Sequence, residues 1–201
     1  MGSSSMPSRD NRPGPHAVLP VRLMGLLLFG IVPFMVGCGD DAGKPSIRHP
    51  QDFLPQELGG MTPEGSPTSA TTADELRVLI DGGYETYTEH NFQEFALQTY
   101  QGTIRESQAE VEVWVFEMPN SDDARALYDD EDLLCAAYHE GLSDIGEQGE
   151  LCYTNEWQRI QFQRDKYWSR VLVRDYSIDA AEDARTVLRL FATHIDQKIV
   201  E

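Results

Sequence analysis

The sequence predicts an α+β fold: a single domain with an antiparallel sheet of about five strands packed by three helices. The main observation is the order of the hydrophobic patterns, which runs helix, two strands, helix, three strands, helix. The 201 residues leave room for one domain, or for one domain plus a tail. A composition of 40% hydrophobic and 25% charged residues is typical of a soluble globular protein. The folded part is expected over residues 73–201.

The first helix is expected to begin after Thr72. Glu75 follows three residues later, and the two side chains together form a capping box. Apolar residues recur at helical spacing over residues 76–87, so the helix is predicted to continue through Gly82 and Gly83. Two glycines inside a helix cost about 1 kcal/mol each. They therefore predict either the close approach of another backbone or a kink.

Two extended runs follow, over residues 92–100 and 110–118. The second run has the alternation of a strand, in which Val111, Val113 and Val115 alternate with Glu112, Trp114 and Phe116. Ser121 is expected to cap a helix that runs from Asp122 to about Tyr138. Its buried stripe is predicted to be Ala124, Leu127, Tyr128, Leu134, Cys135 and Tyr138.

The last third of the chain is predicted to hold three short strands and a closing helix. Residues 141–149 are expected to be a loop, and the strands are expected near residues 150–154, 157–163 and 167–176. The closing helix is expected over residues 180–199. Its inner face is predicted to carry Ala184, Val187, Leu188, Phe191, Ile195 and Ile199.

Residues 1–37 are expected to be a signal peptide. Residues 23–36 contain no charge, and this run is shorter than the roughly 20 residues that cross a bilayer as a helix. It matches the apolar core of a signal peptide that follows a basic segment. It ends in Met-Val-Gly-Cys, which resembles the bacterial lipobox and implies lipidation of Cys38 with cleavage before it. An uncleaved anchor or a buried helix is disfavoured by Gly30 and Pro33, which break helices.

Lipidation would anchor the protein to the bacterial cell envelope, because several acyl chains hold a protein stably in a membrane. Gly39 follows the cysteine, and the rule known for enteric bacteria then favours the outer membrane over the inner one. Residues 38–72 are rich in Gly, Pro, Ser and Thr and are expected to be a flexible tether. Its apolar clusters at residues 53–55 and 58–61 are the parts expected to dock onto the domain.

The acidic composition excludes some partners. The formal net charge is −18, and removal of the signal peptide leaves 13 basic and 33 acidic residues, a net charge of −20. Nucleic acid is not expected as a partner, since phosphate backbones require clustered Lys and Arg. Unaided adhesion to anionic lipid is disfavoured for the same reason.

Two cysteines remain after Cys38 is assigned to lipid. Cys135 and Cys152 form an even pair in an oxidising compartment, so a disulfide between them is predicted. The alternative is two free buried thiols that pack as small apolar groups. Neither belongs to a C-x-x-C motif, and a zinc site would lack two further ligands at suitable spacing.

The segment Ile-Asp-Gly-Gly-Tyr-Glu-Thr-Tyr at residues 80–87 resembles the I-D-G-G-A-E-L-Y segment of an uncharacterised bacterial domain of unknown function, whose members are often exported. The resemblance extends over about residues 53–197 and includes L-P-x-x-L-G-G at residues 54–60. Tyr84 stands where that family has Ala, and Met61 where an aromatic residue often follows the glycines. The resemblance implies the extent of the domain and no activity.

No catalytic residue or metal ligand set is predicted. The five histidines are scattered, and no G-x-S-x-G motif occurs. The acids at residues 122–123 and 129–132 do not fit the calcium-loop spacing, and consecutive acids on a helix point in different directions. These acids are interpreted as a solvated face.

Asp81, Gly82, Gly83 and Glu85 form a candidate motif with two interpretations. Asp81 could accept a substrate proton, and on a helix Glu85 would share its face at the i, i+4 spacing. Alternatively, Asp81 bonds to neighbouring backbone while the glycines fit against the sheet, and this interpretation is favoured.

A basic cluster interrupts the acidic chain at residues 157–174, which hold five basic residues against one acid. Strand alternation places Trp168, Arg170, Leu172 and Arg174 on one face, which Trp157 and Arg159 can share if the strands pair suitably. Such a surface suits carboxylate, phosphate or glycan ligands, because Arg forks bind anions and aromatic rings stack. The favoured alternative is internal neutralisation by Glu110 and Glu112 on a neighbouring strand.

The sequence therefore predicts an exported lipoprotein whose domain, in the periplasm or at the cell surface, binds an envelope protein or an anionic ligand without chemistry and without a cofactor. An envelope hydrolase that uses carboxylates near Asp81 and a structural role in envelope assembly stay open. A deep pocket containing Asp81 would favour the hydrolase, and a shallow face of Arg and Trp would favour binding.

Overall fold

The computed structural model describes residues 48–201. The predicted signal peptide, Cys38 and the beginning of the predicted tether lie outside the described residues. The helices are η1 (Pro50–Phe53), α1 (Ala73–Leu79), α2 (Tyr84–Glu89), α3 (Ser121–Tyr128), η2 (Ile178–Ala180) and α4 (Ala181–Val200). The strands are β1 (Thr62–Pro63), β2 (Thr68–Ala70), β3 (Glu94–Ile104), β4 (Ser107–Glu117), β5 (Tyr138–Leu142), β6 (Gln148–Tyr153), β7 (Trp157–Arg164) and β8 (Tyr167–Arg174).

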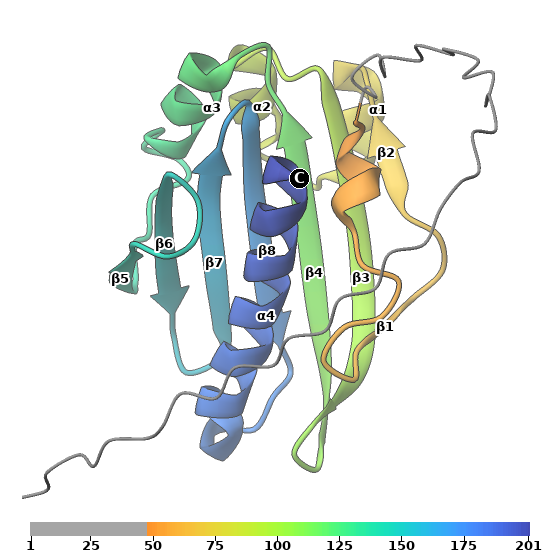
Figure 1. Cartoon of the computed structure of the whole chain (residues 1–201), viewed down its shortest axis with the longest axis vertical. Coiled ribbons are helices and arrows are strands. Elements are labelled where there is room, and N and C mark those ends of the chain that lie inside the picture. Colours follow the sequence, from red (N-terminus) through yellow and green to blue (C-terminus); the bar gives the residue numbers. More distant parts are fainter. Residues whose placement is uncertain (1–47) are drawn as a thin grey trace, which may run out of the picture. The chain divides into compact units, whose positions relative to one another are not determined.

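All the strands pair antiparallel in one sheet, in the order β1-β3-β4-β8-β7-β6-β5, with β2 also paired to β3 (Figure 1). The predicted α+β class with an antiparallel sheet is confirmed. The predicted number of about five strands was too low, since the described part of the chain forms eight. The additional strands are β1, β2 and β5, which are short and lie at the edges of the sheet.

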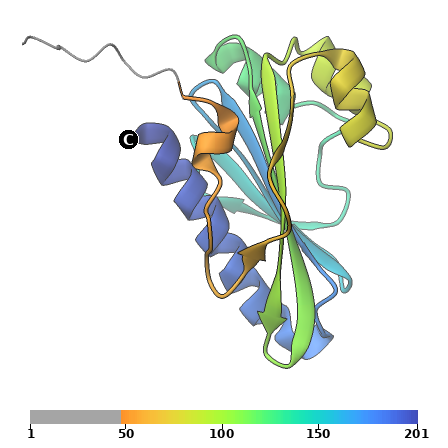
Figure 2. The same cartoon turned by 90° about the vertical axis from the view of Figure 1, so that its right-hand side faces the viewer.

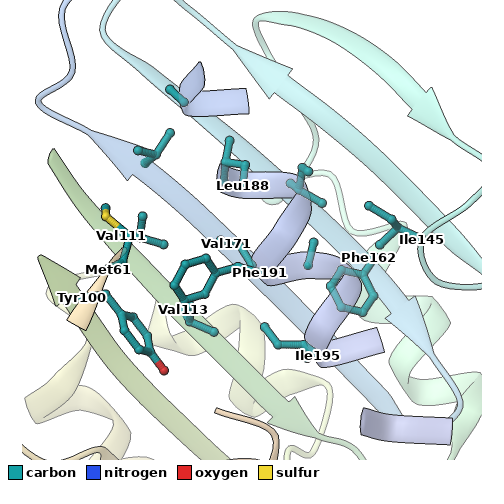
Figure 3. Close-up of a cluster of buried hydrophobic side chains, with 14 of the residues drawn as sticks. Met61, Tyr100, Val111, Val113, Ile145, Phe162, Val171, Leu188, Phe191 and Ile195 are labelled. Atoms are coloured by element: carbon teal, nitrogen blue, oxygen red, sulfur yellow. The ribbon is translucent and has the colours of Figure 1, made fainter. Parts of the chain in front are cut away.

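One face of the sheet is covered along its length by α4, with η1 beside it (Figures 1 and 2). Val111, Val113 and Val171 project from the central strands towards the helix. They pack in one cluster with Leu188, Phe191 and Ile195 of α4 (Figure 3). The closing helix and most of its inner stripe were predicted correctly, because apolar residues recur at helical spacing over its whole length. This core is mainly apolar, with Gln158 and Ser169 as buried polar side chains on the same face of the sheet.

The opposite face is covered only in part. Helices α1, α2 and α3 lie over one end of it, and the other end carries no helix (Figure 2). Beneath the helices is an aromatic core, in which Tyr87 stacks on Phe116 at 4.2 Å between ring centroids and lies 5.7 Å from Trp168. Both faces of β4 are therefore buried at this end of the sheet. The valines of the predicted alternation lie on one face, and the aromatic rings lie on the other.

The assignment of residues 48–72 to a flexible tether was wrong. Phe53 and Met61 are fully buried in the core beneath α4, and β1 and β2 pair with β3. A Cβ added at Gly102 would lie 2.7 Å from the carbonyl oxygen of Gly60, so this contact needs a glycine. The expected docking of the two apolar clusters is confirmed, and it extends the folded part towards the N-terminus.

The first predicted helix is broken at its glycines. Helix α1 begins at the predicted capping box of Thr72 and Glu75 but ends at Leu79, and α2 begins at Tyr84. The extended C-cap Ile80 ends α1, and Gly82 and Gly83 then turn the chain with φ of +83° and +73°, a left-handed conformation that favours glycine. No heavy atom lies within 4 Å of a Cβ built on either glycine, so the predicted close approach of another backbone is wrong.

The second predicted helix is also too long. Helix α3 ends at Tyr128, and residues 129–137 form an irregular strap that runs across the partly covered face to β5. Asp130 ends the helical pattern, because its carboxylate accepts the backbone N–H of Asp132 at 2.9 Å. Leu134 and Tyr138, which were predicted to be buried in the helix stripe, are exposed.

The predicted disulfide between Cys135 and Cys152 is present, with the two Cα atoms 5.8 Å apart. Cys152 is buried on β6, and Cys135 lies on the strap rather than on a helix. The bond therefore ties the strap to the sheet. Within residues 48–201, no helix is both long enough and apolar enough to span a membrane.

Candidate functional site

The strand register brings most of the predicted basic cluster together. Trp157 on β7 lies opposite Arg174 on β8, and Arg159 lies opposite Leu172 two residues further along. These side chains share the partly covered face, on the portion beyond the three helices. With Arg170 they line a shallow depression of about 240 Å³, which we call the Arg–Trp hollow. Its lining is Trp157, Arg159, Arg170, Leu172 and Arg174.

Trp168 is the predicted member that does not belong to the hollow. It shares the face of Arg170, as strand alternation requires, but it is fully buried in the aromatic core under the helices. The boundary between core and hollow therefore falls between Trp168 and Arg170 on β8. On β4 the same boundary falls between the buried Trp114 and the partly exposed Glu112.

The predicted internal neutralisation is also present, in part. Glu112 accepts a hydrogen bond from Nη2 of Arg170 at 3.2 Å and lies 3.9 Å from Nη2 of Arg174. The Arg170 guanidinium also stacks on Trp114, with its Cζ 3.4 Å from the ring centroid. Arg170 is thus fixed between a carboxylate and an indole. Arg174 has only the longer contact, and half of its side chain is exposed.

Arg159 forms no salt bridge within the described part of the chain. Its Nη2 donates to the backbone oxygen of Leu133 at 3.2 Å, and its buried Nε has no hydrogen-bond partner among residues 48–201. Burial, and secondarily the positive charge of Arg170, lowers the pKa of Arg159 from its ordinary value. An anion that approached Arg159 would relieve both effects.

The strap contacts one arginine of the hollow, Arg159, and sequence reasoning missed this element. Its Leu133 carbonyl accepts from Arg159 and also from Nε2 of the buried Gln161, at 3.1 Å. Two contacts hold the strap to α2: Nε2 of His90 lies 2.8 Å from Oδ2 of Asp130, and the Thr86 hydroxyl donates to Asp132 at 3.3 Å. The apolar run over residues 133–138 has helical spacing, so no local signal distinguished the strap from a helix.

The Asp81 motif forms no pocket. Asp81, Gly82, Gly83 and Glu85 are all exposed at the turn between α1 and α2. Asp81 and Glu85 do not lie on one helix, so the spacing argument for a shared face does not hold. The two glycines serve the backbone conformation of the turn, and the arrangement offers no enclosed site for a proton transfer.

Among residues 48–201, the histidines that contact acids do so singly. His49 and His90 pair with single carboxylates, Glu94 and Asp130. Within residues 48–201, no three His, Cys, Asp or Glu side chains are placed to hold one metal ion. Most of the acids at residues 122–123 and 129–132 face solvent, which agrees with their interpretation as a solvated face, although Asp130 and Asp132 also hold the strap.

A second depression, of about 570 Å³, lies at the β5 edge of the sheet. Tyr138 and Tyr153 face each other across β5 and β6, with ring centroids 5.8 Å apart and nearly parallel planes. The lining is otherwise small or neutral: Ala136, Ala137, Thr154 and Asn155. This tyrosine hollow was not foreseen, because Tyr138 was assigned to a buried helix face.

Comparison with known proteins adds no identification: no family model, no curated protein and no solved structure matches this chain.

Proposed function

We propose that this protein is an exported, lipid-anchored bacterial protein whose domain binds an anionic ligand in the Arg–Trp hollow and catalyses no reaction. The observation that carries the binding role is the gathering of three arginines and an indole on the part of the sheet that no helix covers. The uncovered face leaves Arg174 half-exposed and Trp157 and Arg159 partly exposed, while the paired strands hold their backbones in place.

Arginine suits this role for physical reasons. Its guanidinium stays charged at any physiological pH and presents several N–H donors in a plane that matches a carboxylate or a phosphate. Glu112 on Arg170 is an internal example of this recognition. Partial burial strengthens such contacts, because water screens the charges less.

The envelope location rests on the sequence. The uncharged residues 23–36 followed by Cys38 support export and lipidation, and the disulfide supports an oxidising compartment. Residues 54–60, which carry part of the resemblance to the uncharacterised exported domain, belong to the folded part and support membership of that family. Because the mature chain is strongly acidic, the lipid rather than charge would hold it at the membrane.

Binding is tested by isothermal titration calorimetry of the full-length chain with acetate, phosphate and sulfate. At least one of these anions should bind, and Arg170→Ala/Arg174→Ala should abolish the heat. Arg174→Ala alone serves as a second variant, because Arg170 also packs on Trp114 and its loss can perturb the aromatic core. Unchanged binding in both variants, with the fold intact by circular dichroism, would refute the proposal.

The anchor is tested by mass spectrometry of the protein purified from native membranes. The expected N-terminal peptide begins at Cys38 and carries acyl chains, and Cys38→Ser should release the protein from the membrane fraction. An intact N-terminus, or an unmodified Cys38 sulfur, would remove the envelope assignment.

A further inference from the structure

The Arg–Trp hollow is small. Its volume of about 240 Å³ is below the roughly 300–1,000 Å³ of pockets that bury drug-sized ligands. It therefore has room for one ring with a substituent, not for a cofactor or an enclosed polymer segment. The anion that we propose as the ligand must therefore be a small molecule.

The floor and one wall of the hollow are apolar. Leu172 and the indole of Trp157 both line the hollow, and Leu172 is nearly buried while Trp157 is partly exposed. The Arg159 guanidinium carbon lies 5.8 Å from the centroid of the Trp157 ring. A flat or ring-shaped body that stacked on the indole would therefore place a substituent next to a guanidinium group.

Of the three arginines, two have unused capacity for an anion. Arg170 is occupied by Glu112 and Trp114, as described above. Arg159 has no carboxylate partner in the described part of the chain, and Arg174 has only the 3.9 Å contact and a half-exposed side chain. Arg159 and Arg174 approach the hollow from neighbouring strands as diagonal neighbours, since Arg159 lies opposite Leu172 and Arg174 lies opposite Trp157.

The charge on this face favours one negative charge over two. Glu110 lies opposite Arg174 in the register, Glu112 contacts Arg170, and Glu150 accepts from Gln161 beside Arg159. Three glutamates thus balance the three arginines, and the whole chain is strongly acidic. A phosphate dianion or a polyanion would be repelled by these carboxylates more than a monoanion would.

We propose that the Arg–Trp hollow binds a small monocarboxylate carried on a six-membered ring, with the ring on Trp157 and Leu172 and the carboxylate between Arg159 and Arg174. This inference rests on the proposed anion-binding function and specifies its ligand. Two sources supply this chemistry, an aromatic carboxylate and a sugar acid, and both present one charge beside a ring that can stack on an indole.

The experiment titrates the full-length chain with benzoate, glucuronate, phosphate and benzyl alcohol, followed by calorimetry and by tryptophan fluorescence. Benzoate or glucuronate should bind at least about tenfold more tightly than phosphate or benzyl alcohol, since either competitor lacks one of the two recognition elements. Tighter binding of benzoate identifies aromatic carboxylates as the source, and tighter binding of glucuronate identifies sugar acids. Either result supports the proposal.

Single substitutions separate recognition of the carboxylate from recognition of the ring. Arg174→Gln and Trp157→Leu should each weaken binding of the preferred carboxylate about tenfold or more. Trp157→Phe retains a ring and should weaken it less, which guards against a folding defect in the leucine variant. The matched control is Arg189→Gln on α4, which removes an ion-paired arginine from the opposite side of the sheet and should change nothing.

The outcomes distinguish this inference from the proposed function. If phosphate binds as tightly as the carboxylates, or if Trp157→Leu binds normally, the hollow is a general anion site and only the monocarboxylate inference is wrong. If neither the carboxylates nor phosphate binds, both the inference and the proposed anion-binding function are wrong.

Discussion

The two faces of the sheet differ in how they are buried, and the difference locates the site. On one face a single long helix, α4, runs along the sheet over a mainly apolar core, in which Gln158 and Ser169 are buried polar exceptions (Figure 1). On the other face three short helices cover an aromatic core at one end, and the strap runs beside this core. Beyond the helices the exposed side chains of the sheet include charged residues. The first face stabilises the fold, and the second leaves part of the sheet available for a ligand.

The boundary between buried and charged side chains can be followed along a single strand. Along β8, Val171 and Val173 face α4 without interruption, while on the other side the buried Trp168 is followed by Arg170 and Arg174. A strand can therefore contribute apolar side chains to a core on one face and charged side chains to the surface on the other.

The largest effect is expected in the core under α4. Phe191→Ala should lower the free energy of unfolding by about 3–5 kcal/mol, because it removes a fully buried ring and leaves a cavity. The neighbouring Leu190 is partly exposed on the same helix, so Leu190→Ala should change the free energy of unfolding by about 0.5 kcal/mol or less. Chemical denaturation of both variants measures the difference. Equal losses would contradict the assignment of the core.

The disulfide tests the strap on the opposite face. Cys135→Ala/Cys152→Ala should lower the free energy of unfolding by about 3 kcal/mol in the chain-entropy picture, since the bond joins residues 17 positions apart. Hydrogen exchange should become faster at residues 129–137 and remain unchanged in α4. Reduction of the native protein is the matching control, and exchange that rises equally on both faces would show that the bond stabilises the whole domain instead.

The smallest effect on stability is expected at the hollow. Arg174→Ala should change the free energy of unfolding by less than about 1 kcal/mol, because its contact with Glu112 is long and exposed. The same change should remove most anion binding. Denaturation and calorimetry on one variant give both numbers, and a loss of stability as large as that of Phe191→Ala would make Arg174 a structural residue.

Local pattern was sufficient for the elements that pack along one face. The stripe of α4 and the alternation of β4 predicted their burial because each has one period over many residues. The same alternation placed Arg170 and Arg174 on one face of β8. The pairing on which the inclusion of Trp157 and Arg159 depended is present, with Trp157 opposite Arg174 and Arg159 opposite Leu172.

The elements that the sequence did not reveal depend on contacts between distant residues. The strap has the spacing of a helix, but contacts with distant residues hold it in another conformation. Asp130 and Asp132 contact α2 and its C-cap, the Leu133 carbonyl accepts from β7, and Cys135 is bonded to Cys152. Residues 48–72 have the composition of a tether, yet they pair with β3 and fill the core with Phe53 and Met61. The exclusion of Trp168 from the hollow likewise depends on where the helices sit, which strand alternation does not encode.

Acid should act on the two faces at different pH values. On α4, burial lowers the pKa of His194 below its ordinary value of 6.5, so the neutral form is the one that the folded state stabilises. Its contribution to stability is present above pH 6.5 and is lost as the pH falls through the lower pKa of the folded state. On the strap, the hydrogen bond from His90, and secondarily that from the Asp132 backbone, lowers the pKa of Asp130 below 3.8. Its contribution is present above pH 3.8 and is lost only as the pH falls through that still lower value.

Acidification should therefore loosen α4 first and the strap last. Hydrogen exchange, corrected for the intrinsic pH dependence of amide exchange, should show protection of α4 falling as the pH drops below 6.5, while residues 129–137 stay protected until the pH is below 3.8. His194→Gln should remove the first change and leave the second, and Asp130→Asn should remove the second and leave the first. If the strap instead opens near pH 6 while α4 keeps its protection, the acid sensitivity of the domain lies on its ligand-binding face and not in its core.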